Sequence, residues 1–464
     1  MTRIAILGGG PGGYESALVA AQLGAEVLVV DRDGLGGACV LTDCVPSKTL
    51  IATSEAMTTF ACSEGLGVRL RSGAEAAQQV TVDLPAVNAR VKALALAQSL
   101  DIARRLGREG VEVVRGSARM VGANRLVVRT DDGEEGYGAD VVLIATGASP
   151  RRLGDAEPDG ERILTWQQLY DLPTLPEHLV VVGSGVTGAE FASAYVALGS
   201  QVSLVSSRDR VMPSEDADAA LLLEDVFTRR GMQIVKRSRA AGVTRTSDGV
   251  VVKLDDGRDV EGSHCLVAVG SVPNTAGIGL EHVGVATDER GYIRVDRVSR
   301  TTAPGVYAAG DCTGVLLLAS VAAMQGRIAM WHALGDAVEP LRLSNVAANV
   351  FTDPEIATVG LGLAAAEGER GGVQEVKLLL GTNARAKMQG ITDGFVKLYC
   401  RPGAGTVLGG VVVAPRASEL ILPVSLAVQN ALTVDQLAHT FTIYPSLSGS
   451  VTEAARQLHL AERG

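Results

Sequence analysis

One pattern occurs twice in this chain of 464 residues and limits the folds open to it. An apolar run, Ile4–Leu7, leads into the glycines of Gly8–Gly13 and then into a segment with helical apolar spacing. Residues 179–205, which begin LVVVGSGVTG, repeat the same order. A strand, a G-x-G-x-x-G turn and a helix open a Rossmann-like unit, so the repeat predicts two dinucleotide-binding units.

The residues of the first loop have separable roles. The first glycine turns the chain, the second lets backbone N–H groups approach a pyrophosphate, and the third lets the helix pack on the strand. Asp31 lies 23 residues after Gly8, at the position where a carboxylate accepts hydrogen bonds from the ribose hydroxyl groups of the cofactor. A glycine pattern alone is equally typical of a tight turn, but the flanking strand and helix favour cofactor binding. The candidate residues are Gly8, Gly10, Pro11, Gly13 and Asp31.

The second loop, with Gly183, Gly185 and Gly188, differs at the end of its second strand. Ser206 stands where the first unit has an acid, and Arg208 follows. An acid there repels a 2′-phosphate, whereas a small polar residue with arginine accepts one. Such arginines are often only solvated loop charges. The pattern predicts NADPH preference or dual use of NADPH and NADH.

Composition excludes several classes of function. The net charge of −10 leaves no general basic face for nucleic acid. We find no signal-peptide pattern and no run of the roughly 18 apolar residues that a membrane span needs. The expected location is cytoplasmic.

Two of the six cysteines, Cys39 and Cys44, lie in GGACVLTDCVPSK (36–48). A tetrahedral metal site needs four ligands, and no nearby Cys/His pair completes the set, so no metal is expected. A redox pair needs a distorted backbone, because residues five apart on a regular helix face different directions. We expect Cys44 just before a helix starting near Ser47, where the helix N-terminus and Lys48 favour the thiolate.

This segment resembles the redox signature of the flavoprotein disulfide reductases, the class I pyridine nucleotide-disulfide oxidoreductases that include dihydrolipoamide dehydrogenase. The resemblance extends over essentially the whole chain. The further matching segments are Ala145–Gly147, Gly188–Phe191, Gly305–Asp311 and Phe351–Glu355.

The resemblance implies an α/β fold with two Rossmann-like domains and an α+β C-terminal dimerisation domain. The expected boundaries are 1–148 for the FAD-binding domain, 149–271 for the NAD(P)-binding domain, 272–342 for the continued FAD-binding domain and 343–464 for dimerisation. The chain is expected to form a homodimer or a higher even homo-oligomer. Further FAD-binding candidates are Gly37, Lys48, Gly116, Thr146, Gly147 and Asp311, and Glu190 and Gly270 join the NAD(P)H set.

The resemblance also implies catalytic roles. Hydride passes from NAD(P)H to FAD. The cysteine matching Cys44 faces the flavin, and the one matching Cys39 attacks a substrate disulfide. Lys48 is expected near the reactive flavin nitrogen, paired with Glu190, although its residue type alone equally fits a surface charge at a helix start.

The sequence departs from the family at its acid/base pair. Disulfide reductases end in His-Pro-Thr-x-x-Glu, delivered from the other subunit, whereas here Tyr444 replaces the histidine and Gly449 the glutamate. A histidine titrates near neutral pH, but a tyrosine phenol ordinarily titrates at about pH 10. Because such acid–base help is typically worth about 10²–10⁴-fold, we expect at most trace disulfide reductase activity.

The predicted function is transfer of electrons from NAD(P)H through FAD to a quinone-type acceptor, which needs no thiol proton shuttle. The sequence is similar to the actinobacterial NAD(P)H quinone reductase branch of the family. The candidate catalytic residues are Cys39, Cys44, Lys48, Glu190 and Tyr444. The alternatives are a soluble pyridine nucleotide transhydrogenase, a dihydrolipoamide dehydrogenase-like disulfide reductase, and a non-catalytic flavin-bearing subunit.

Overall fold

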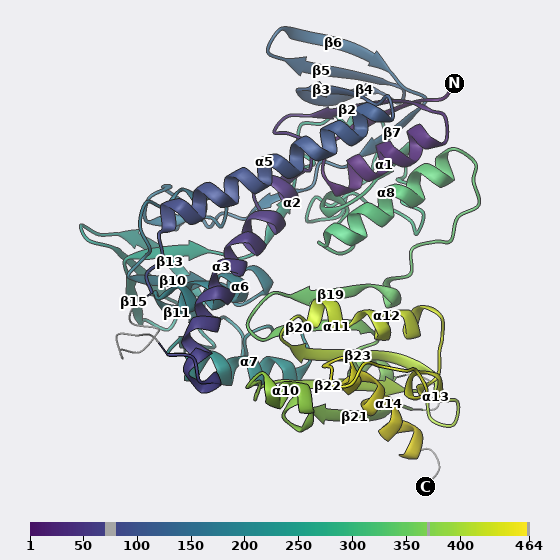
Figure 1. Ribbon diagram of the computed structural model, residues 1–464. Helices are drawn as coiled ribbons and strands as arrows, with labels where there is room; N and C mark the ends of the chain where they lie inside the picture. The colour runs from purple at the N-terminus through teal and green to yellow at the C-terminus, as the bar shows by residue number, and fades with distance from the viewer. Residues whose placement is uncertain (70–79, 369–371, 462–464) are drawn as a thin grey trace.

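The structure is a computed structural model that describes residues 1–69, 80–368 and 372–461. Figure 1 shows three packed bodies, with the chain termini at opposite ends of the molecule. Among the described residues, no helix is long and apolar enough to cross a membrane.

A parallel sheet contains the N-terminal strand. Its strands, in spatial order, are β18 (Val306–Ala308), β7 (Val141–Ile144), β1 (Arg3–Leu7), β2 (Glu26–Asp31) and β3 (Glu112–Arg115). Helices α1 (Pro11–Gln22) and α8 (Ala319–Ala333) pack together on one face (Figure 1). An antiparallel meander of β4 (Ser117–Gly122), β5 (Arg125–Thr130) and β6 (Gly133–Gly138) packs against β2. Strands covered on both sides need continuous apolar runs, which explains Ile4–Leu7.

A second parallel sheet repeats this arrangement. Its strands, in spatial order, are β12 (Gln233–Val235), β11 (Gln201–Val205), β10 (His178–Val182), β16 (His264–Val267) and β9 (Ile163–Leu164). Its helices are α6 (Val186–Leu198) and α7 (Ala217–Arg229), and its meander is β13 (Ala240–Arg245), β14 (Val250–Leu254) and β15 (Asp259–Gly262). The predicted repeat of two Rossmann-like units is therefore confirmed.

The chain passes twice between the two sheets. The crossing segments β8 (Ala148–Pro150) and β17 (Ser271–Pro273) pair antiparallel, and the chain then returns to the first sheet as β18. The short 3-10 helices after these crossings are η2 (Gln168–Asp171), η3 (Leu280–His282) and η4 (Asp311–Thr313). The domain boundaries at residues 148, 271 and 342 stay predictions.

The C-terminal body is an antiparallel sheet with helices. The strands, in spatial order, are β19 (Ala347–Val350), β20 (Glu355–Gly360), β23 (Val407–Ala414), β22 (Phe395–Cys400) and β21 (Gln374–Leu379). The helices are α9 (Leu363–Glu367), α10 (Ala384–Met388), α11 (Ala417–Leu420), α12 (Leu422–Gln429), α13 (Val434–Ala438) and α14 (Gly449–Ala461), with short turns η5 (Leu343–Asn345) and η6 (Leu380–Thr382). The predicted fold class, two Rossmann-like domains with an α+β C-terminal domain, is confirmed.

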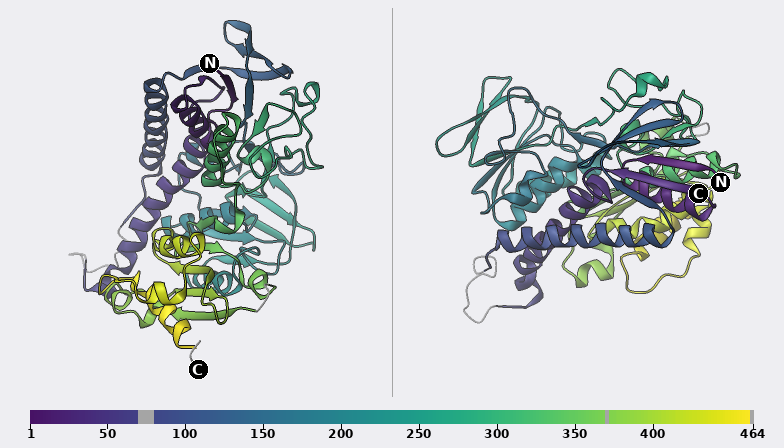
Figure 2. Two further views of the ribbon diagram at one scale, coloured as in Figure 1. Left: turned by 90° about the vertical axis from the view of Figure 1, so that its right-hand side faces the viewer. Right: turned by 90° about the horizontal axis from the view of Figure 1, so that it is seen from above.

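A helical arm joins the bodies. It comprises α2 (Gly37–Leu41), α3 (Cys44–Cys62), η1 (Ser63–Leu66) and α5 (Leu84–Arg108), and α3 packs on α6 of the second sheet (Figure 2). The predicted helix start near Ser47 is wrong, because Cys44 is itself the first residue of α3. The Ser47 N–H already donates to the Asp43 carbonyl at 2.7 Å, and proline is tolerated in a first helical turn.

Candidate functional site

The first glycine loop has little room for side chains. Gly8 has a φ of +105°, and a Cβ on it would overlap the carbonyl oxygen of Ala145. A Cβ on Gly13 would overlap the carbonyl oxygen of Gly8. Gly10 precedes α1 and Pro11 is its first residue, so the free N–H groups of the helix start lie beside the loop. This geometry suits a phosphate group.

Asp31 ends β2 and fixes the neighbouring backbone. Its Oδ2 accepts a hydrogen bond from Gly9 N at 2.6 Å, and its Oδ1 accepts from Asp33 N at 2.9 Å and Gly34 N at 2.7 Å. The carboxylate therefore ties the strand end to the glycine loop. It also lines a cavity, where a ribose hydroxyl is the expected partner.

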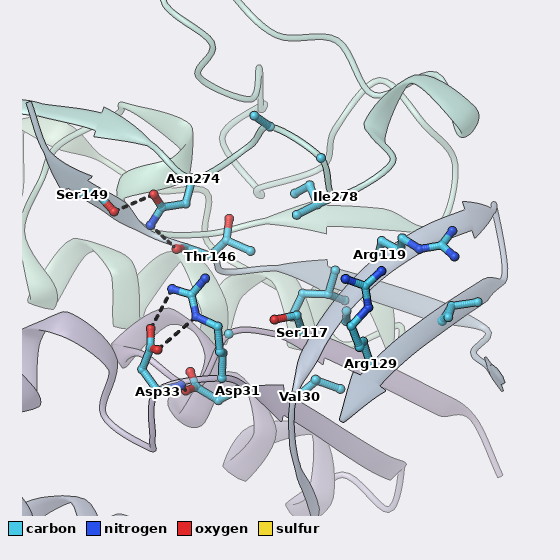
Figure 3. Close-up of a pocket in the computed structure, with 18 of the residues that line it drawn as sticks. Val30, Asp31, Asp33, Ser117, Arg119, Arg129, Thr146, Ser149, Asn274 and Ile278 are labelled. Atoms are coloured by element: carbon cyan, nitrogen blue, oxygen red, sulfur yellow. Dashed lines mark hydrogen bonds and ion pairs between the residues drawn. The ribbon is translucent and has the colours of Figure 1, made fainter. Parts of the chain in front are cut away.

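That cavity has a volume of about 540 Å³ (Figure 3). It brings together four of the predicted FAD-binding residues, namely Gly8, Asp31, Gly116 and Thr146. A Cβ on Gly116 would lie 2.5 Å from the Arg129 carbonyl oxygen, so the close approach of the meander requires glycine. The cavity and the glycine loop together fit the adenosine and pyrophosphate parts of FAD.

Sequence reasoning missed the far wall of this cavity. Figure 3 shows Ser117, Arg119 and Arg129 on the meander and Asn274 beside β8. Asn274 donates from Nδ2 to the Thr146 carbonyl at 3.0 Å. No sequence pattern marks Ser117, Arg119 and Arg129, because they reach the cavity only through tertiary packing.

Of the other predicted FAD residues, Gly147 and Asp311 follow strands of the first sheet and Gly37 packs on its glycine loop. Gly37 has a φ of +57°, and a Cβ on it would lie 2.8 Å from the Cα of Gly10, so α2 packs directly on the glycine loop. Gly147 follows β7 and accepts a hydrogen bond from Asn274 N at 3.0 Å. Asp311 begins η4, and burial together with the charge of Asp43 raises its pKa to about 6.

Cys39 lies on α2 and Cys44 begins α3, and both are half-buried free thiols. The hydrogen bond between the thiols lowers the pKa of Cys39 and raises the pKa of Cys44. Burial and the charge of Asp43 also raise the pKa of Cys44. Of the two thiols, Cys39 is thus the one with the lowered pKa, whereas the sequence pattern pointed to Cys44.

Lys48 and Glu190 come from α3 and α6 and form an ion pair of 2.8 Å. The Glu190 side chain is only 4% exposed, and its second oxygen accepts from Phe351 N at 2.9 Å. The Lys48 ammonium also lies 4.7 Å from the centre of the Phe351 ring. Burial lowers the pKa of Lys48, but the charge and hydrogen bond of Glu190 outweigh it and raise the pKa above its ordinary value. The predicted pairing is thus present in the structure.

Two further acidic groups near the thiols escaped sequence reasoning. Burial raises the pKa of Asp43, which forms no capping hydrogen bond at the start of α3. The hydroxyl of Tyr170 is buried and bonds to no described residue, and burial followed by the charge of Asp43 raises its pKa well above the ordinary value. Gln167 donates to the Thr42 hydroxyl at 3.1 Å, which ties the Tyr170 segment to the cysteine segment.

The second glycine loop repeats the first. Gly183 has a φ of +112° and faces the Ala268 carbonyl oxygen, a Cβ on Gly188 would overlap the Gly183 carbonyl oxygen, and Gly185 precedes α6. Gly270, with a φ of +97°, follows β16.

Of the two candidate 2′-phosphate ligands after β11, Ser206 is buried and already hydrogen-bonded, whereas the Arg208 side chain is exposed. Ser206 is fully buried, and its hydroxyl lies 2.7 Å from the Ser184 hydroxyl and accepts from Arg208 N at 3.1 Å. The Arg208 side chain is exposed and makes no hydrogen bond or ion pair with the described residues. Arg208 is therefore the better-placed group for a 2′-phosphate.

Tyr444 lies between α13 and α14, and Gly449 is the first residue of α14. The Tyr444 side chain is 85% exposed, so it touches little of its own chain. Its role in the site stays a prediction. Within the described residues, no group of three or more His, Cys, Asp or Glu side chains is arranged to hold a metal ion.

Comparisons with known proteins agree with this geometry. Residues 2–326 match the family described as pyridine nucleotide-disulphide oxidoreductase, and residues 346–455 match its dimerisation domain. The chain is 56% identical to the NAD(P)H dehydrogenase (quinone) of Mycobacterium tuberculosis, over 99% of this chain and 94% of that protein. It is 35% identical to the dihydrolipoyl dehydrogenase of Chlorobaculum tepidum, over 97% of this chain and 96% of that protein.

A solved structure supports the same relationship. The crystal structure of LpdA (Rv3303c) from Mycobacterium tuberculosis matches with a TM-score of 0.94 and 56% identity, covering 99% of this chain and 100% of that chain. The chain therefore belongs to the pyridine nucleotide-disulphide oxidoreductase family, whose members are flavoproteins that use FAD and NAD(P)H.

Proposed function

We propose that this protein is an NADPH-preferring quinone reductase with little or no disulfide reductase activity. The observation that carries the proposal is the combination of an intact Lys48–Glu190 pair with Tyr444 and Gly449 at the positions of the family's acid/base pair. The name of the 56% identical relative, NAD(P)H dehydrogenase (quinone), supports the same acceptor class.

The chain's own residues have distinct tasks in this proposal. Gly8, Gly13 and Asp31 would hold the pyrophosphate and ribose of FAD, and Asp311 would bind the side chain that carries its flavin. FAD, when bound, supplies the two-electron chemistry that links NAD(P)H to the acceptor. Lys48, oriented by Glu190, provides a fixed positive charge at the reducing centre.

Reduction of a quinone to a hydroquinone consumes two electrons and two protons. NADPH supplies a hydride, and the remaining proton comes from solvent or from a phenol such as Tyr444. No thiol must leave as a protonated group, so the missing histidine is not required. We also propose a cytoplasmic homodimer, which the matching dimerisation domain supports.

Disulfide reduction is the competing activity, since Cys39 and Cys44 are retained as free thiols and the chain is 35% identical to a dihydrolipoyl dehydrogenase. The two functions separate in NADPH oxidation assays with menadione, lipoamide, glutathione disulfide and thio-NAD as acceptors. We expect turnover with menadione and only trace turnover with either disulfide. Lipoamide turnover equal to that with menadione overturns the proposal, and turnover with thio-NAD alone indicates a transhydrogenase.

Two variants refine this assay. The double variant Cys39→Ser/Cys44→Ser is expected to keep menadione reduction within about twofold, because serine is close to cysteine in size and the proposed electron path from FAD to the quinone does not use the thiols. Loss of menadione reduction shows instead that the thiols relay electrons. Arg208→Ala is expected to raise the KM for NADPH on the order of tenfold and leave the KM for NADH unchanged.

A further inference from the structure

The loop of residues 206–216 leads from β11 to α7 and carries Arg208 and Arg210. We call it the 206–216 loop. Its first residue is fixed on the glycine-loop side by the contact between the Ser206 and Ser184 hydroxyls at 2.7 Å. Its last residue, Asp216, precedes α7 and is fixed from a different body of the molecule.

Asp216 is bound by side chains of β22 in the C-terminal sheet. Lys397 Nζ donates to its two oxygens at 2.9 and 2.8 Å, and Tyr399 Oη donates to Oδ2 at 3.0 Å. Oδ1 also accepts from the backbone N–H groups of Asp218 at 3.0 Å and Ala219 at 3.2 Å, which caps α7. The carboxylate thus holds its helix and the neighbouring domain in one geometry.

This ion pair is buried. The Lys397 side chain is 3% exposed and that of Asp216 is 9% exposed. Lys397 Nζ also lies 2.9 Å from Asp218 Oδ2, in the first turn of α7. At the other end of α7 the same bodies are joined by Arg229 and Asp393 at 2.7 Å, and the Arg229 side chain is half exposed. Exposed pairs contribute little, whereas removal of one partner of a buried pair leaves an uncompensated charge.

The middle of the 206–216 loop touches the second glycine loop directly. Met212 N donates to the Ser184 carbonyl at 2.9 Å, and Val211 N donates to Glu224 Oε1 at 2.7 Å. Met212 has a φ of 51°, a region that non-glycine residues occupy only when their surroundings hold them there. Four residues after Met212, the chain reaches Asp216 and its lysine.

We propose that Lys397 and Tyr399 are positioning residues for the nicotinamide nucleotide: they fix Asp216, and through the 206–216 loop they set the placement of Arg208 and of the Gly183–Gly188 loop. The C-terminal domain therefore increases the affinity for NAD(P)H, in addition to its expected role in joining two subunits. This inference rests on the proposed nucleotide role of Arg208, and not on the identity of the acceptor.

The test measures NADPH affinity without an acceptor. Flavin bleaching by NADPH under anaerobic conditions gives a Kd for the nucleotide and a limiting reduction rate. Lys397→Met removes the charge and keeps the length, Asp216→Asn keeps the helix cap, and Tyr399→Phe removes only one hydroxyl. We expect the Kd for NADPH to rise about three- to tenfold with an unchanged limiting rate and an unchanged FAD content.

The matched control is Arg229→Met, which breaks the exposed pair at the far end of α7 and is expected to leave the Kd unchanged. The proposal is overturned if Asp216→Asn and Tyr399→Phe leave the Kd for NADPH unchanged. It is also overturned if Arg229→Met raises this Kd as much as they do, because that result indicates a general loosening of the contact between the domains. Tyr399→Phe keeps the test valid if Lys397→Met does not fold. A failure of the quinone proposal is seen in a separate measurement. In that case NADPH bleaches the flavin of the wild-type protein, but added menadione does not restore the flavin absorbance.

Discussion

At the scale of single residues, the contact of Lys48 with Glu190 and Phe351 joins three segments of the chain. Glu190→Gln keeps an acceptor for Phe351 N and removes the charge opposite Lys48. We expect flavin reduction by NADPH to slow on the order of 10- to 100-fold, because misplacement of a catalytic group by about 1 Å has effects of this size. Stopped-flow absorbance of the flavin measures the rate.

The control for this variant is Glu15→Gln. Glu15 is also largely buried and pairs with an arginine, Arg327, at 2.6 Å, but it lies on α1. It is expected to change the reduction rate by less than about twofold. Equal slowing in both variants contradicts the assigned role of Glu190.

Asp43 gives a prediction with a defined pH dependence. Burial raises its pKa, so the folded protein binds this proton more tightly than the unfolded chain does. Its contribution to stability is complete below the ordinary pKa of about 3.9 and is lost as the pH rises through the raised pKa. Asp43→Asn cannot ionise, so we expect a higher Tm than the native protein at pH 7.5 and no difference near pH 4.

Asp159 serves as the opposite case. Burial alone raises the pKa of the Asp159 carboxyl group. Hydrogen bonds from the backbone N–H groups of Arg162, Glu161 and Ile163 outweigh burial, so the pKa of Asp159 is lowered. Asp159→Asn is therefore expected to lower the Tm at pH 7.5, with a smaller effect as the pH falls. Calorimetry of the FAD-loaded protein at both pH values measures the two variants, and the same sign for both contradicts the argument.

The residues that sequence reasoning found and missed differ in a physical way. Gly8, Gly13 and Asp31 lie within one strand–loop–helix–strand unit, so their spacing alone marks them as candidates. Asp43 and Tyr170 gain their raised pKa values from burial among distant segments, which no local pattern encodes. Spacing likewise does not reveal which of the two thiols has the lowered pKa.

At the scale of elements, the duplicated glycine loops allow a paired prediction. Gly13→Ala and Gly188→Ala each place a Cβ against the carbonyl oxygen of the loop's first glycine. We expect Gly13→Ala to be purified with little FAD. We expect Gly188→Ala to keep FAD and to bind NADPH at least about tenfold more weakly, because the helix can no longer pack close to the strand.

Flavin absorbance per chain and the Kd for NADPH measure the two effects. Equal loss of FAD in both variants contradicts the separate roles of the two loops. A matched control is Gly24→Ala in the turn after α1, where no heavy atom lies within 4 Å of the added Cβ. Its positive φ of +82° makes it a test of backbone strain alone.

The elements themselves were predictable where their signal was local. Two apolar strands, two glycine turns and their helices follow from the repeat. The start of α3 at Cys44 was not predictable, since a proline in the first turn looks like a helix boundary from sequence alone. The pairing of β18 with β7 was also hidden, because the strands of the second sheet separate these two strands in the sequence.

At the scale of the whole molecule, an exposed apolar segment lies between α13 and α14. Phe441, Ile443 and Tyr444 are all more than 80% exposed, although they are large hydrophobic side chains. Exposed large apolar side chains that lie close together are typical of an interface, and the segment belongs to the region that matches the dimerisation domain. We infer that a second copy of the chain covers it.

Ile443→Asp tests this inference and its functional meaning together. A charge buried at the interface is expected to convert the dimer to a monomer at micromolar concentration, measured by light scattering. If Tyr444 acts in the partner's site, the monomer loses menadione reduction but keeps bleaching of its flavin by NADPH, because both glycine loops and the Lys48–Glu190 pair lie within one chain. Leu221→Asp, at an exposed site on α7, is the matched control and is expected to remain dimeric and active.

If Ile443→Asp is a monomer that reduces menadione at the wild-type rate, the partner subunit has no role in acceptor reduction. If Ile443→Asp remains a dimer, the inferred interface is wrong.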